Sequence, residues 1–435
     1  MNTIMKFRIL SGILITTIFA FNSLMLYGQD RGKTITECID IAFNNNPELK
    51  FQEMKIREAE SKYLQQIGNL LPQIDTSLSY NRFEKELPSK KVLIGESLDD
   101  YYADISLRQI LFSGGKYVLE KDIARISLDA ETAKYEQLKR QVKLSVEKAY
   151  YELLRTIHTV RNQKELSMKL KEQLQISQLL YNSGKISNLD VLIIETQAAL
   201  SEDMINNLEN LVYTKSLLLA QTMGIKEPVT IQEDIPEIRK NIKINTYCLH
   251  NNFKDHPELN YAQNLQEKSQ VEIKVAKSEL FPSIFFRANY NIENGDWYLA
   301  DPSWSNWYVG VGITIPLFHG GSIHARVDQA LARYEQISET KRRSEINIKV
   351  RFESARSNLI YQASHFETTQ RILDLAKEAL TTAELKYNSG KLSAIELIDA
   401  EMVWNNAQNN YINDMINYLI ATAEIEAICL QAIAK

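Results

Sequence analysis

The 435-residue sequence lacks the patterns that identify an enzyme. It has no nucleophile motif and no phosphate loop, and its six histidines are scattered without the spacing that places two metal ligands on one helix face. The net charge of -5 is mild, and no basic patch with interleaved aromatic residues occurs. We therefore expect no catalysis, no cofactor, no metal site and no nucleic-acid partner.

Long apolar runs are also missing once the first residues are set aside. Lys6 and Arg8 precede an apolar run over residues 9–21, which has the plan of a secretory signal peptide and is too short to span a bilayer stably. A polar flank begins at Gln29, so residues 1–28 are the expected signal peptide, and no cysteine stands at the junction for a lipid anchor. Without a spanning helix, the mature chain can enter a membrane only as a β-barrel.

The sequence does contain a heptapeptide that occurs twice, at residues 181–187 and 387–393. The copies read YNSGKIS and YNSGKLS, and each stands between two long helical patterns. Gly184 and Gly390 can adopt the left-handed conformation that ends a helix. Each copy is therefore predicted to be a tight turn between two helices.

Both turns also carry the pattern of a helix N-cap. Ser187 and Ser393 can cap the helix that follows, and Asp190 and Glu396 stand three residues later, which completes a capping box. Asp399 lies one turn beyond Glu396 and is not needed for a cap. It is either a solvated surface residue or, together with Glu396, part of a ring of carboxylates at a pore mouth, which would favour cations and could gate the pore.

Three further motifs repeat in the same order, which indicates a duplicated chain. They pair residues 46–49 with 256–259, 71–72 with 281–282, and 111–115 with 317–321. We therefore divide the mature chain into a first repeat over residues 29–225, a linker over 226–245 and a second repeat over 246–435. The linker contains two prolines and is expected to cross the outside of the helices.

Alternating apolar and polar residues follow a proline in each repeat and predict β-strands. Four strands are expected, at about residues 73–83, 101–112, 283–292 and 307–317. They could form a soluble sheet, but Trp297, Trp304 and Trp307 gather around the second pair, as in the aromatic girdles of outer-membrane barrels. Since single-chain membrane barrels have at least about eight strands, four strands require oligomerisation, and a ring of three chains would give twelve.

Proline is absent from residues 115–181 and 321–387, and each run would form a helix about 100 Å long. Apolar residues recur in these runs every three or four positions, so one stripe stays on one helix face. Helices that begin after the repeated turns run back along them. The sequence therefore predicts two long antiparallel hairpins whose tips are the two turns.

The three cysteines, Cys38, Cys248 and Cys429, are widely spaced. Cys38 and Cys248 fall at equivalent places in the two repeats, which favours small apolar residues buried between packed helices. A disulfide is also compatible with an exported protein, but an odd number of cysteines leaves at least one thiol free.

Taken in order, these motifs resemble the TolC-type outer membrane efflux proteins over the whole mature chain. The resemblance rests on the proline-led strands, the Leu-Phe-x-Gly-Gly step at 111–115 and 317–321, and the Tyr-x-x-Gly-x-x-Ser tips that precede an acidic residue. It implies a mostly α fold with membrane β-structure, in which a homotrimer forms a twelve-stranded barrel in outer-membrane lipid and an α-helical tunnel through the periplasm. It also implies a passive exit duct for efflux or type I secretion. Its partners would be a periplasmic adaptor (membrane fusion protein) and an inner-membrane pump of the RND, ABC or MFS type.

The resemblance also implies roles for residues at the tips. Asp190 and Tyr387 would tie the inner hairpin to its neighbour in a closed state, and Glu396 and Asp399 would form an acidic constriction. Leu392 stands where the best-studied type has an arginine that helps to hold the tip closed, so the strength of this lock is open. The residues expected to contact an adaptor are Ser183, Gly184, Lys185, Ser389, Gly390 and Lys391.

A periplasmic coiled-coil adaptor or scaffold is the alternative function, because it would explain the hairpins. An adaptor should have one hairpin flanked by small β-domains, whereas this sequence predicts two hairpins and four amphipathic strands. The sequence therefore favours the duct.

Overall fold

The computed structural model describes residues 32–234, 253, 255–295, 304–389 and 391–429. In chain order its elements are α2 (Ile35–Asn45), α3 (Pro47–Gly68), β1 (Gln73–Arg82), α4 (Lys91–Ile94), β2 (Asp99–Ser113), α5 (Lys116–Asn182), α6 (Asn188–Met223), α8 (Pro257–Ser278), β3 (Ser283–Asn294), β4 (Trp304–Thr314), α9 (Ser322–Asn388) and α10 (Ala394–Ile428). The predicted fold class, long helical hairpins with four strands, is confirmed. None of the helices in the described ranges combines the length and the apolar character that a membrane crossing requires. The expected signal peptide and most of the expected linker lie outside the described residues.

The chain divides into two compact units, and each contains parts of both repeats. The helical unit comprises Met1–Pro47, Arg140–Ile244 and Glu353–Lys435, and the sheet unit comprises Glu48–Lys139 and Asn245–Phe352. Both long helices, α5 and α9, contribute to each unit. The repeat is therefore the unit of duplication, whereas packing joins the equivalent portions of the two repeats.

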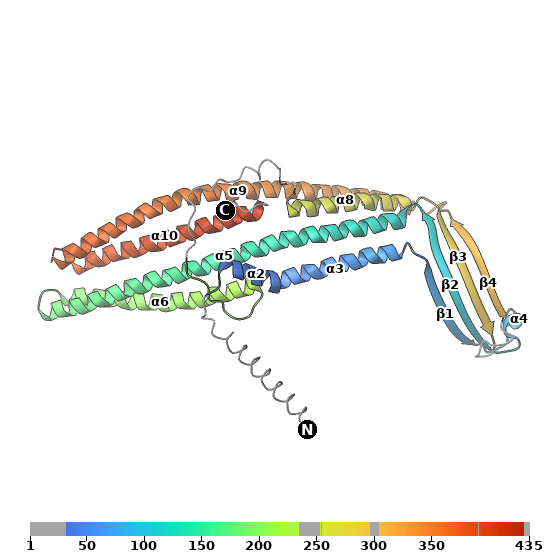
Figure 1. The fold of residues 1–435 in the computed structure, drawn as a ribbon, viewed down its shortest axis with the longest axis horizontal. Helices are drawn as coiled ribbons and strands as arrows, with labels where there is room; N and C mark the ends of the chain where they lie inside the picture. Colours follow the sequence, from blue (N-terminus) through green and yellow to red (C-terminus); the bar gives the residue numbers. More distant parts are fainter. Residues whose placement is uncertain (1–31, 235–252, 254, 296–303, 390, 430–435) are drawn as a thin grey trace, which may run out of the picture. The chain divides into compact units, whose positions relative to one another are not determined.

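The sheet unit contains one four-stranded antiparallel sheet in the order β1-β2-β3-β4 (Figure 1). The outer pairs, β1 with β2 and β3 with β4, each come from one repeat. The central pair, β2 with β3, joins the two repeats and has a register shift between Ile110 and Phe112. β1 and β4 are therefore the two edges of the sheet.

The strand bounds differ from the sequence predictions by up to three residues. The fourth strand, predicted at about 307–317, is β4 and both begins and ends three residues earlier. Pro316 has no N–H to donate to a ladder, and Thr314 already pairs with Ser283, the first residue of β3. The connection between β1 and β2 contains the four-residue helix α4.

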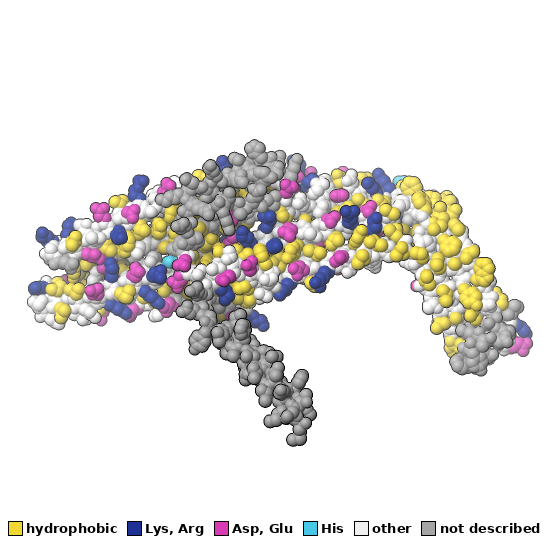
Figure 2. Space-filling model, viewed as in Figure 1, with side chains coloured by type: hydrophobic (Ala, Val, Ile, Leu, Met, Phe, Trp, Pro, Cys, Tyr) yellow, Lys and Arg dark blue, Asp and Glu magenta, His cyan; other side chains and the backbone are white. Residues whose placement is uncertain are grey.

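The sheet leaves apolar side chains exposed along both edge strands. Leu78 of β1 is 78% exposed and Trp307 of β4 is 69% exposed. Figure 2 shows hydrophobic side chains over most of the sheet, whereas charged side chains are spread over the helices. A single chain thus presents an apolar surface and two open ladder edges, both of which call for a partner.

Gly312 lies opposite Phe285 in the ladder between β3 and β4, and the Phe285 ring occupies the space beside it. A Cβ atom at residue 312 would stand 2.2 Å from Cζ of that ring. We expect Gly312→Ala to displace the ring and destabilise the sheet by about 1–3 kcal/mol, the usual cost of overpacking. The temperature at which the assembled protein dissociates on a semi-native gel measures this effect.

Gly310, on the same strand and the same face, is the matched control because no atom lies within 4 Å of a Cβ built there. Gly310→Ala should leave the dissociation temperature unchanged. An equal loss in both variants would show that the Phe285 contact is not the cause.

The helical unit consists of two hairpins, α5 with α6 and α9 with α10, together with α2 (Figure 1). The apolar stripe of α5 is buried as the spacing predicts, at Val142, Val146, Leu153 and Val160. In the second hairpin the stripe of α9 is buried at Ala355, Leu359, Phe366, Ala376, Leu380 and Ala383. α2 begins with a capping box between Thr34 and Glu37.

The first residues of the expected linker pack on the helical unit. Lys33 and Ile231 form a parallel bridge, and the Tyr150 hydroxyl donates to the carbonyl of Gln232 at 3.1 Å. Nε2 of His158 lies 3.0 Å from the carbonyl oxygen of Glu233, and burial lowers the pKa of this histidine. His158 therefore has a structural role, because it connects α5 to the first residues of the expected linker.

The cysteines differ in state. Cys38 is a free thiol with 0% exposure, and Cys429 is disulfide-bonded. Cys248 lies outside the described residues. Burial raises the pKa of Cys38 to about 11, so little thiolate is present at about pH 8.

We expect Ellman's reagent to detect no thiol in the native protein. After unfolding without reductant, the reagent should detect the thiol of Cys38 alone. Detection of all three thiols would show that the Cys429 bond is absent.

Candidate functional site

The first tip, between α5 and α6, is built by a glycine in the left-handed conformation. Gly184 has a φ of +74°, and the backbone N–H of Lys185 donates to the carbonyl of Leu180 at 3.0 Å. The hydroxyl of Ser183 donates to the same carbonyl at 2.8 Å. Both bonds satisfy the Leu180 carbonyl, which the last turn of α5 would otherwise leave without a partner.

The second tip, between α9 and α10, repeats this pattern. The backbone N–H of Lys391 donates to the carbonyl of Lys386 at 2.9 Å, and the hydroxyl of Ser389 donates to the same carbonyl at 2.9 Å. Gly390 lies outside the described residues. The exposed polar side chains at the tips include those of Ser183, Lys185, Ser389 and Lys391.

A capping box follows each tip. The backbone N–H of Ser187 donates to Oδ2 of Asp190 at 3.1 Å, and that of Ser393 donates to Oε2 of Glu396 at 2.9 Å. Both serine hydroxyls accept from the N–H of the acidic residue in return. The backbone N–H and the hydroxyl of Ser393 hold the pKa of Glu396 below its usual value, so this carboxylate is charged at neutral pH.

The expected gate residues are placed around these turns but do not all meet. Tyr387 and Leu392 pack against the apolar core of the second hairpin, and Asp399 is exposed. Within the described part of the chain, no hydrogen bond joins Asp190 to Tyr387. Their pairing in a closed state stays a prediction.

Apolar side chains hold each hairpin together near its tip. The second hairpin has a core that consists of Leu380, Ala383 and Leu397. The first hairpin has a core of Leu170, Ile194 and Ala198. Ile398 of α10 belongs to the same cluster and Ala394 of α10 packs against it, so the second hairpin contributes apolar side chains to the core of the first.

Polar contacts also join the two hairpins over several turns. Hydrogen bonds from α5 to α10 join Arg155 to Asn417 at 2.7 Å, Asn162 to Asn409 at 2.9 Å, and Gln173 to Glu401 at 2.7 Å. Lys169 of α5 pairs with Glu384 of α9 at 3.1 Å. When such helices separate, water replaces the lost hydrogen bonds at a small net cost.

Gln173 and Glu401 are residues that the sequence reasoning missed. Glu401 is 3% exposed, and this burial raises its pKa to about 7. The negative charges of Glu384 and Glu172 act in the same direction, while Lys169 acts against them. One pattern in the sequence could have indicated Glu401. Glu401 and Asn405 are polar residues spaced four apart on the buried face of α10, where apolar residues are expected.

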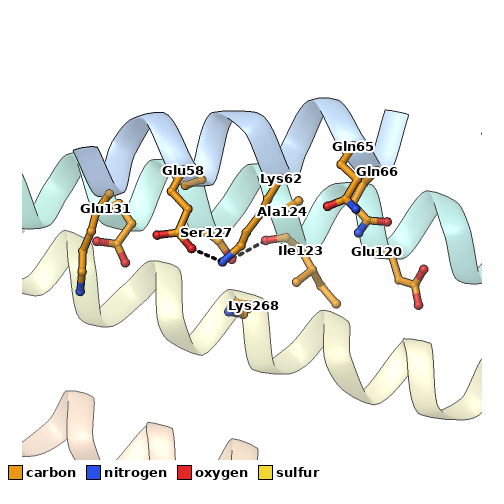
Figure 3. A pocket seen from close by; sticks show the side chains of 12 residues that line it. Glu58, Lys62, Gln65, Gln66, Glu120, Ile123, Ala124, Ser127, Glu131 and Lys268 are labelled. Atoms are coloured by element: carbon orange, nitrogen blue, oxygen red, sulfur yellow. Dashed lines mark hydrogen bonds and ion pairs between the residues drawn. The ribbon is translucent and has the colours of Figure 1, made fainter. Parts of the chain in front are cut away.

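A cavity of about 630 Å³ lies in the sheet unit between α3, α5 and α8 (Figure 3). Its walls carry charges of both signs, and Lys62 pairs with Glu58 at 2.6 Å. Across the described residues, no group of three or more His, Cys, Asp or Glu side chains could hold a metal ion.

A comparison with models of protein families shows to which family the chain belongs. The family model described as "Outer membrane efflux protein" matches residues 38–225 and 249–429. The chain belongs to this family. The two matched blocks cover most of both repeats, so membership in the outer membrane efflux protein family favours the duct over the alternative of an adaptor or scaffold.

Individual members of the family are distant in sequence. The outer membrane protein TolC of Escherichia coli (strain K12) is 21% identical over 403 residues, which cover 88% of this chain and 79% of TolC. The probable outer membrane lipoprotein SilC of Salmonella typhimurium is 24% identical over 397 residues, 84% of this chain and 79% of SilC.

Solved structures of efflux channels share the fold. The CmeC outer membrane channel of Campylobacter jejuni superimposes with a TM-score of 0.78 at 18% identity, over 91% of this chain and 85% of CmeC. The open state of the MtrE outer membrane channel of Neisseria gonorrhoeae superimposes with a TM-score of 0.73 at 17% identity, over 91% of this chain and 88% of MtrE. The family is one of outer-membrane channels and not of enzymes.

Proposed function

We propose that three copies of this chain form a passive exit duct through the outer membrane, which receives its cargo from a periplasmic adaptor and an inner-membrane pump. The observation that carries this proposal is the four-stranded sheet with two open edges and exposed apolar side chains. In a ring, β1 of one copy would pair with β4 of the next, which removes every edge. Three copies give a twelve-stranded barrel with its apolar side chains toward lipid.

The hairpin tips are the proposed mouth of the duct and its contact with the adaptor. The exposed side chains of Ser183, Lys185, Ser389 and Lys391 leave both tips polar. The pump, of the RND, ABC or MFS type, would supply the energy, because no nucleotide-binding loop occurs in the sequence. Export of the chain itself is assigned to the cleaved segment 1–28, without a lipid anchor.

The gate is proposed to work by movement of the second hairpin against the first. The second hairpin has an apolar core of its own, and polar side chains such as Asn162 and Asn409 form part of its contact with the first hairpin, which supports movement of the two as separate bodies. In the closed state Asp190 and Tyr387 link neighbouring hairpins, and Leu392 contributes no cationic contact. Glu396 and Asp399 from each copy would form the acidic constriction.

Planar-bilayer recording tests the duct and its acidic mouth together. We expect the purified protein to form channels that prefer cations, and we expect that preference to fall sharply in Glu396→Ala with Asp399→Ala. The control removes two exposed carboxylates of α9, Asp374→Ala with Glu378→Ala, and should keep the preference. Channels whose conductance and selectivity do not change in the first variant would contradict the acidic mouth, and a protein that forms neither channels nor a heat-sensitive trimer would contradict the duct.

A further inference from the structure

A buried carboxyl group, that of Glu401, stands between the two hairpins about two helical turns from the tip. Oε1 of Glu401 on α10 accepts from Nε2 of Gln173 on α5 at 2.7 Å. Glu401 is 3% exposed and Gln173 is 8% exposed, so water reaches neither side chain freely. This hydrogen bond joins the first hairpin to the second.

Several buried oxygen atoms near this pair have no hydrogen-bond partner. Three of them are acceptors, namely Oε2 of Glu401, Oε1 of Gln173 and Oδ1 of Asn405, and the fourth is the hydroxyl of Ser177, which can donate or accept. An ionised Glu401 adds a negative charge to a site that has no donor for its second oxygen, which is costly in a buried place. A proton on the carboxyl removes the charge and supplies a donor.

The charges that face Glu401 come from two other helices. Lys169 and Glu172 lie on α5, and Glu384 lies on α9. Lys169 is already paired with Glu384 at 3.1 Å, so its positive charge is shared. The surroundings therefore disfavour the ionised carboxylate as long as the hairpins are packed together.

We propose that Glu401 is a proton-operated latch, which in its neutral form lets the hairpins pack and in its ionised form drives them apart. This latch rests on the proposed gate, because the same separation of the two hairpins would open the duct. Closing of the duct would therefore be coupled to the binding of a proton by Glu401, and opening would release that proton.

The direction of the pH dependence follows from the two states of the carboxyl. In the packed seam the pKa of Glu401 is about 7, and in a separated, solvated seam it returns to the ordinary value of 4.5. The packed form therefore binds more protons between these values and loses stability as the pH rises through this window. From about pH 5.5 to about pH 8, we expect the ratio of separated to packed hairpins to rise about tenfold or more.

Distance measurements between spin labels test the latch directly. Labels at Ser183→Cys and Ser389→Cys place one probe on each exposed tip, and dilution with unlabelled chains restricts each pair to one chain. The buried thiol of Cys38 should stay unlabelled. We expect the long-distance population to grow from about pH 5.5 to about pH 8 in the otherwise unchanged protein, and to stay at its low-pH level in Glu401→Gln.

Two further variants assign the response to this residue. Gln173→Met removes the donor that favours the ionised form, so it should raise the pKa of Glu401 and move the transition to higher pH. Glu147, a buried carboxylate elsewhere on α5 whose pKa burial raises to about 6, provides the control. Glu147→Gln should keep the response, and the latch is wrong if Glu147→Gln abolishes it or Glu401→Gln retains it.

Bilayer recording separates this inference from the proposed function. If the unchanged protein forms channels but neither the label distances nor the open probability depend on pH, the latch is wrong and the duct stands. If no channel forms but the label distances follow the expected pH dependence, the latch stands and the duct is wrong.

Discussion

Replacement of Lys90 by methionine should release the connection between β1 and β2 from the end of the sheet. Nζ of Lys90, at the start of α4, lies 2.7 Å from Oδ2 of Asp100 and 2.5 Å from Oε1 of Glu293. These carboxylate side chains are only 1% and 7% exposed. Without Lys90 two buried negative charges would face each other, and breaking such a buried pair costs about 3–5 kcal/mol. Since the Lys90 side chain is 30% exposed, we expect the lower end of that range.

Lys91→Met is the matched control for this prediction. Lys91 pairs with Glu96 at 2.8 Å, but both side chains are largely exposed, so its loss should cost less than about 1 kcal/mol. The readouts are the dissociation temperature of the assembled protein and the rate of chymotrypsin cleavage within residues 83–98. A loss that is the same in both variants would show that burial of the pair does not matter.

The tips show which features a sequence can predict. Each capping box connects groups three residues apart, and its geometry is the same in any helix, so Ser187 with Asp190 and Ser393 with Glu396 were predictable from local pattern alone. The duplication strengthened the prediction because the same turn occurs twice. The class of the fold followed from helical and strand periodicity in the same way.

The seam shows what a sequence conceals. Gln173 and Glu401 are 228 positions apart, and Lys90 and Glu293 are 203 positions apart. Nothing in the local pattern of either partner specifies the other, because the contact depends on how two helices or a loop and a strand pack. The bounds of β4 depended in the same way on its register with β3.

Replacement of Ile398 by alanine should loosen the tip of the second hairpin from the first. Ile398 is 4% exposed and packs on Leu170 of α5 and Ile194 of α6. It is the α10 member of the buried apolar cluster that joins the hairpins near the tip, and Ala394 packs against the same cluster. An isoleucine-to-alanine change in a packed site costs about 2–5 kcal/mol. A cost at the lower end would favour the separated hairpins by about 30-fold, which single-channel open probability measures.

Two neighbours on α10 separate this effect from a general loss of stability. Ile395 is 39% exposed, so Ile395→Ala should change neither open probability nor dissociation temperature. Leu397 is buried within the second hairpin, so Leu397→Ala should lower the dissociation temperature without raising open probability as far as Ile398→Ala does. If Leu397→Ala opened the channel as strongly as Ile398→Ala, the gate would depend on the integrity of the second hairpin and not on its contact with the first. The residue that controls opening would then lie inside a hairpin, and the movement of two rigid hairpins would be wrong.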